Sequence, residues 1–182
     1  GWTELDATWV EERTYPQVNG YHPYLYGDSP VRRPLLPLDS GAAGTGTYDD
    51  AVFEIWLNER WGDVVMREYW ERRAAEPSKD VLESWDAVLA RRGTSLAASW
   101  AGFTGWNHLV GARASAGVGY PDAADYPAGE PYARVESYPA RVAGNVARLA
   151  AAPVELGGFA ALGEALVRLE FDGDDDGGPL SL

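Results

Sequence analysis

Residues 47–70 read TYDDAVFEIWLNERWGDVVMREYW, and this stretch decides the fold. Apolar side chains recur at helical spacing over residues 52–57 and again over residues 64–70, with Gly62 between the two groups. Glycine ends helices readily because it adopts backbone conformations that other residues avoid. The stretch therefore predicts two consecutive helices, and their short link makes them neighbours that pack roughly antiparallel.

The same stretch carries residues that favour helix starts. Thr47 is expected to be the N-cap of the first helix, with Asp49 and Asp50 in the first turn, where the helix dipole favours negative charge. Asp63 is expected to cap the second helix in the same way.

Helical spacing continues on both sides of this pair. Further helices are predicted over residues 2–13, 81–89 and 95–110, the last of them capped by Thr94 or Ser95. Each presents one apolar stripe, so we expect most of the eight tryptophans to lie in a shared core. The fold class is predicted to be mainly α.

Two regions depart from the helical pattern. Residues 16–46 are rich in glycine and proline and are expected to be irregular. Residues 165–171 alternate apolar and polar side chains, and together with the end of the chain they predict a short β hairpin. We therefore divide the chain into a helical lobe, residues 1–152, and the start of a β-rich appendage, residues 153–182.

Composition excludes several classes of function. The net charge is −13, with no basic stripe that could bind nucleic acid. No apolar run approaches the roughly 18 residues that a membrane span needs. Cysteine is absent, which rules out disulfides and cysteine-based zinc sites.

Histidine is scarce. His22 and His108 are the only two, they stand far apart, and no H-E-x-x-H sequence offers a metal two imidazoles on one helix face. The ordinary interpretation of His108 is a packed or hydrogen-bonded side chain, and that of His22 is an exposed loop residue.

Three phrases resemble one enzyme family. Residues 2–9, WTELDATW, have the form W-x-E-x-x-A-x-W, which is similar to the glutamate helix of the gluzincin zinc metallopeptidases. Residues 48–62 resemble a downstream helix of that family that opens with tyrosine and ends with glycine, and residues 103–107, FTGWN, resemble a later phrase of bacterial secreted members. Leu5 and Asp6 depart from the family pattern, which often has glycine and an aromatic residue there.

The resemblance implies a fold, a function and two site residues. The fold would be the helical carboxy-terminal lobe of a zincin-like metallopeptidase, secreted, that cleaves peptides or proteins with zinc-activated water. Glu4 matches the third zinc ligand, and Tyr48 matches the tyrosine that stabilises the oxyanion. Both histidine ligands would come from an upstream segment of the same protein, so we expect the chain alone to be inactive and to bind zinc weakly or not at all.

Other interpretations stay open. Glu4 could be a solvated acid favoured by the helix dipole, and Tyr48 an aromatic residue at an interface. The whole chain could be a non-catalytic module that binds carbohydrate or peptide through its many aromatic residues, or a helical interaction domain. Burial of the tryptophans would count against a binding groove.

The acidic run at residues 172–177, DGDDDG, has the D-x-D-x-D-G spacing of a calcium loop. Calcium at Asp172–Asp176 is one interpretation. The glutamate that such a loop needs would fall beyond Leu182, and the run sits between predicted strands, so an acidic hairpin turn is the favoured interpretation.

Overall fold

A computed structural model describes residues 2–39, 48–161, 163–164 and 166–170 of the chain. The described part is mainly helical, as predicted. The α-helices are α1 Trp2–Thr14, α2 His22–Leu25, α3 Val52–Trp61, α4 Asp63–Ala75, α5 Val81–Ala90 and α6 Leu96–His108. Short 3-10 turns are η1 Asp49–Ala51, η2 Gly111–Arg113, η3 Ala123–Asp125 and η4 Phe159–Ala161, and the strands are β1 Ala133–Val135 and β2 Val154–Leu156.

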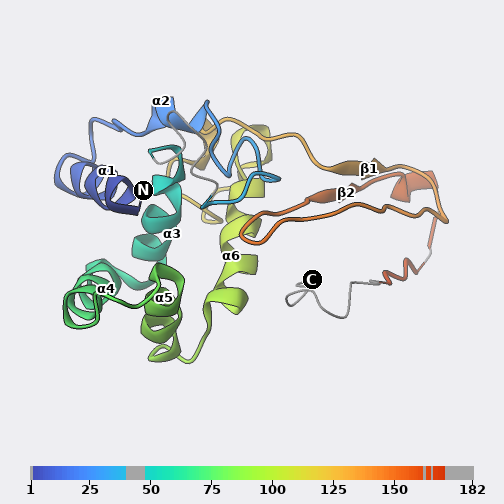
Figure 1. Ribbon diagram of the computed structural model, residues 1–182. Helices are drawn as coiled ribbons and strands as arrows, with labels where there is room; N and C mark the ends of the chain where they lie inside the picture. Colours follow the sequence, from blue (N-terminus) through green and yellow to red (C-terminus); the bar gives the residue numbers. More distant parts are fainter. Residues whose placement is uncertain (1, 40–47, 162, 165, 171–182) are drawn as a thin grey trace.

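Helix α3 forms the centre of the helical body. It lies between α1 and α6, with α4 and α5 beside its lower end (Figure 1). All six residues from 52 to 57 are buried, because neighbouring elements cover α3 on every side. The ring of Phe53 contacts aromatic rings from four helices: Trp2 of α1, Trp56 of α3 itself, Trp85 of α5, and Trp100 and Phe103 of α6.

The tryptophans belong largely to this core, as expected. Three are buried (Trp9, Trp56 and Trp85), and four more are partly buried against the core: Trp2, Trp61, Trp100 and Trp106. Trp70 is the exception, at 38 % exposed. Even so, its indole N–H donates to Asp6 Oδ1 at 3.0 Å and thereby joins α4 to α1.

The helix caps follow the sequence in part. The Ser95 hydroxyl accepts the Ala98 N–H at 3.1 Å, which confirms it as the cap of α6. The prediction for Asp63 is wrong, because Gly62 both ends α3 and caps α4. Asp63 is instead the first residue of α4, and its carboxylate accepts hydrogen bonds from Arg13 and Asn58. Thr47 lies outside the described residues.

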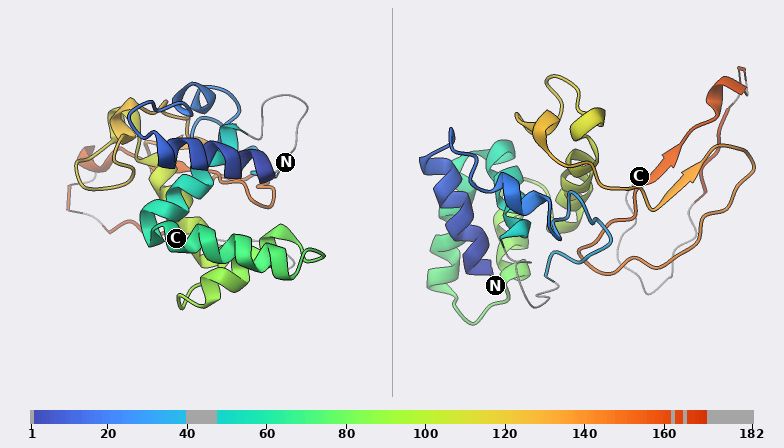
Figure 2. Two further views of the ribbon diagram at one scale, coloured as in Figure 1. Left: turned by 90° about the vertical axis from the view of Figure 1, so that its left-hand side faces the viewer. Right: turned by 90° about the horizontal axis from the view of Figure 1, so that it is seen from above.

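The β structure lies elsewhere than predicted. β1 and β2 pair in parallel, with Arg134 opposite Glu155. They belong to an arm that leaves the helical body and returns to it (Figures 1 and 2). Residues 166–170 form no strand, and Leu169, on the apolar face of the predicted strand, is 52 % exposed. The rest of the predicted hairpin lies outside the described residues.

The division at residue 152 stays a prediction, although β1 and β2 pair across it. Backbone hydrogen bonds hold the base of the arm to the loop after α2: Leu38 N–H donates to Leu149 O at 2.8 Å, and Ala151 N–H to Pro34 O at 2.7 Å. In the described part of the chain, no helix is both long enough and apolar enough to cross a membrane.

Candidate functional site

Glu4 lies in the first turn of α1, on the margin of the helix face that packs against the body. Leu5, Thr8 and Trp9 are the buried residues of α1, and Glu4 beside them is half-buried. The Thr8 hydroxyl donates to the Glu4 carbonyl oxygen at 3.0 Å, within the same helix. The backbone of Glu4 therefore belongs to a well-packed helix, while its side chain remains partly accessible to solvent.

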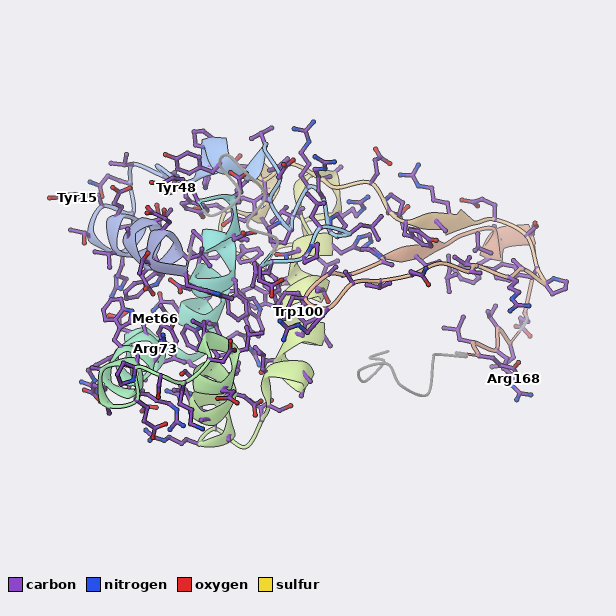
Figure 3. All side chains as sticks on the ribbon, viewed as in Figure 1. Tyr15, Tyr48, Met66, Arg73, Trp100 and Arg168 are labelled. Carbon is purple, nitrogen blue, oxygen red and sulfur yellow. The ribbon has the colours of Figure 1, made fainter. Side chains whose placement is uncertain are left out.

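Tyr48 is brought to Glu4 by the packing of α1 against η1. Its hydroxyl lies within hydrogen-bonding reach of the Glu4 carboxylate, and this hydrogen bond, with the negative charge of Glu4, raises the pKa of Tyr48. The Tyr48 ring stacks on that of Tyr24, with centroids 5.3 Å apart. Tyr48 stays accessible, at 36 % exposed, at the end of the body where α1 meets η1 (Figure 3). It thus keeps its proton and can donate a hydrogen bond.

These residues supply only part of a zinc site. A catalytic zinc ion usually has three protein ligands. Glu4 offers one carboxylate, and the described residues contain no group of three or more histidine, aspartate or glutamate side chains placed to hold a metal. The chain can therefore contribute one zinc ligand at this point, and the other ligands would have to come from elsewhere.

Neither histidine lies at this site. His22 packs edge-on against Tyr21 and Tyr126, with ring centroids 4.7 and 5.3 Å away. His108 lies at the end of α6, 3.7 Å from Glu155, and burial together with the charge of Arg113 lowers its pKa. His108 is half-buried beside Glu155, in keeping with a packed residue, and His22 is half-buried in α2 rather than an exposed loop residue.

Glu54 is a buried acid that the sequence interpretation did not single out. It is fully buried on α3, and no N–H group in the described part of the chain donates to either of its carboxyl oxygens. Burial, and then the charge of Asp6 within hydrogen-bonding reach on α1, raise the pKa of Glu54 well above its ordinary value. The signal was present in the sequence as one acid inside the apolar run of residues 52–57.

Asp49 and Asp50 are both buried. Asp49 Oδ2 accepts the backbone N–H of Asp28 at 2.9 Å. Burial and the neighbouring charge of Asp49 raise the pKa of Asp50 to about 8. The two acids were predicted in the first turn of the helix, but they lie in the 3-10 turn η1, which precedes α3 and packs against α1.

The acidic run at Asp172–Asp176 lies outside the described residues, so the calcium interpretation stays a prediction.

Comparison of the chain with known protein families, with curated proteins and with solved structures found no match.

Proposed function

We propose that these residues form the helical lobe of a secreted, gluzincin-like zinc metallopeptidase. In this proposal Glu4 is the third zinc ligand and Tyr48 is the oxyanion donor. A preceding segment of the same protein contributes two histidine ligands and the glutamate that activates water. The substrate is a peptide or a protein.

One observation carries the proposal, namely the proximity of Glu4 and Tyr48. The resemblance selected these two residues separately, from two phrases far apart in the sequence. The fold places the Tyr48 hydroxyl within hydrogen-bonding reach of the Glu4 carboxylate. A ligand and an oxyanion donor that serve one metal must both reach its coordination sphere, so the proximity of Glu4 and Tyr48 is compatible with the pair of roles.

The two side chains have chemistry suited to these roles. The Glu4 carboxylate would occupy one coordination position, and the packed face of α1 holds it in place. A tyrosine hydroxyl ordinarily has a pKa of about 10, so Tyr48 keeps its proton at neutral pH and can donate to an oxygen that becomes negative. Zinc, when bound, supplies a water molecule with a pKa of about 7 as the nucleophile.

The alternative of an aromatic binding module has less support. It requires tryptophan and tyrosine side chains that line an open groove, but seven of the eight tryptophans belong to the core or pack against it. The exposed aromatic residues near the site are tyrosines, Tyr24, Tyr26 and Tyr48. A carbohydrate array that detects binding by the chain would favour this alternative.

Zinc titration of two forms of the protein tests the proposal. The 182-residue chain alone should bind zinc weakly and should not cleave a fluorogenic peptide library. A form that also includes the preceding segment should bind one zinc ion and cleave peptides. In that longer form, Glu4→Gln should abolish zinc retention during gel filtration, and Glu11→Gln, an exposed acid on the same helix, should not.

Tyr48→Phe separates the second role from the first. The variant should retain zinc but lose most of its kcat with little change in KM, because only the transition state uses the donated hydrogen bond. Tight zinc binding by the 182-residue chain alone, or full activity of Glu4→Gln, would overturn the proposal. So would a preceding segment without a histidine pair.

A further inference from the structure

The ring of Tyr24, on the short helix α2, lies against the ring of Tyr48. The two centroids are 5.3 Å apart and the ring planes are 25° from parallel, which is a stacked arrangement. Both side chains remain partly accessible, at 37 % and 36 % exposed, and α2 and Tyr48 lie at the same end of the helical body (Figures 1 and 3). A stacked neighbour restricts the rotation of a ring, so Tyr24 limits the positions that the Tyr48 hydroxyl can take.

The backbone of Tyr24 is itself held in place. Its N–H donates to Tyr21 O at 2.9 Å, and its carbonyl oxygen accepts the Gly27 N–H at 3.0 Å. The next residue, Leu25, is 1 % exposed and belongs to the hydrophobic core. The Tyr24 ring therefore projects from a well-packed backbone and can serve as a fixed wall for Tyr48.

A second contact joins the chain after α2 to η1, the turn that follows Tyr48. Asp49 Oδ2 accepts the backbone N–H of Asp28 at 2.9 Å, and Asp49 is only 1 % exposed. Gly27 makes this close approach possible, because a Cβ at that position would lie 2.6 Å from the same oxygen. The contact therefore helps to set the distance between the rings of Tyr24 and Tyr48, which lie beside it in the sequence.

We propose that Tyr24 is a positioning residue that holds the Tyr48 hydroxyl where it can donate to the oxyanion. This inference rests on the proposed function of Tyr48. Tyr24 does not touch the reacting atoms and acts only through Tyr48. Without the stack, Tyr48 spends only part of its time in the donating position, so kcat falls, whereas KM changes little because substrate binding does not use that hydrogen bond.

Kinetics of the longer form, which includes the preceding segment, test the role of the ring. Tyr24→Ala should lower kcat about threefold to tenfold with little change in KM, because a ring contact of this kind stabilises one position by about that factor. Tyr24→Phe keeps the stacked ring and should retain the parent kcat. Tyr26→Ala is the matched control, since Tyr26 ends the same helix, is 55 % exposed and makes no ring contact in the described part of the chain.

The Tyr48→Phe background separates positioning from a merely structural role. If Tyr24 acts only through the Tyr48 hydroxyl, Tyr24→Ala should have no further effect on kcat once that hydroxyl is absent. A residue that only stabilises the fold would lower kcat by the same factor in both backgrounds.

Two measurements perturb the stack without depending on each other. Gly27→Ala displaces the Asp49 carboxylate and should lower kcat in the same sense as Tyr24→Ala, whereas Gly20→Ala, where a Cβ would meet nothing within 4 Å, should not. In the 182-residue chain, carbon-13 relaxation of a labelled Tyr48 ring should show greater mobility in Tyr24→Ala than in Tyr24→Phe, with no zinc or substrate present. Circular dichroism confirms that each variant folds.

Three outcomes would overturn this inference and leave the proposed function intact. They are a parent kcat for folded Tyr24→Ala, an equal loss of kcat from Tyr24→Ala in both backgrounds, and a Tyr48 ring that is no more mobile in Tyr24→Ala than in the parent chain. Full kcat of Tyr48→Phe would instead overturn the proposed function, and this inference with it.

Discussion

Replacing Glu54 with glutamine should make the protein less sensitive to rising pH. Glu54 is fully buried, and burial together with Asp6 raises its pKa in the folded protein well above the ordinary 4.5. Between pH 4.5 and that raised pKa, the folded chain holds a proton that the unfolded chain has released. Raising the pH therefore favours unfolding, by about 1.4 kcal/mol for each pH unit in that window.

Urea denaturation at several pH values between about 5 and 7 measures this slope. Glutamine cannot ionise, so Glu54→Gln removes the contribution. The free energy of unfolding of the variant, relative to the parent chain, should rise by up to about 3 kcal/mol over those two pH units.

Two further variants complete the experiment. Glu71→Gln changes an exposed acid on α4 that pairs with Arg67, so its pH profile should run parallel to that of the parent chain. Asp6→Asn removes the charge that raises the pKa of Glu54, so the loss of stability should end at a lower pH. Parallel profiles for Glu54→Gln and the parent chain would refute the reasoning.

Three smaller predictions concern packing, backbone and surface charge. Trp85 is fully buried, so Trp85→Ala should lower the free energy of unfolding by about 3–5 kcal/mol in urea denaturation. Gly62 has φ +72° and ψ −179°, so Gly62→Ala should cost about 1–3 kcal/mol, whereas Gly105→Ala within α6, where a Cβ would meet nothing within 4 Å, should stabilise the protein in the same assay. Arg13 and Asp63 form an exposed ion pair, so Arg13→Gln should leave the midpoint of thermal unfolding unchanged within error.

The helices could be predicted from the sequence because their signals are local. Apolar residues three and four positions apart mark a buried face, and Ser95 marks a start, whatever else the chain does. Asp63 misled the prediction because the choice between cap and first helical residue depends on the link to α3, where Gly62 serves both helices. That choice is made by tertiary contacts.

The strands and the sites could be predicted only in part. β1 and β2 have three residues each, too few for an alternating pattern, and their pairing depends on the course of the arm. The resemblance selected Glu4 and Tyr48, but the sequence alone did not predict that their side chains would lie close together.

Hydrogen bonds hold the base of the arm to the helical body. We therefore expect the protein to tolerate a break or an insertion in the outer part of the arm. Backbone hydrogen bonds join Leu38 to Leu149 and Pro34 to Ala151, where the arm returns to the body. The Trp100 indole N–H donates to Ala150 O beside them. A cut by a protease in residues 140–146, which are exposed and form no helix or strand, would leave both cut ends attached to the folded body. The same stretch is therefore a suitable place for inserting a reporter domain or for opening new termini in a circular permutant.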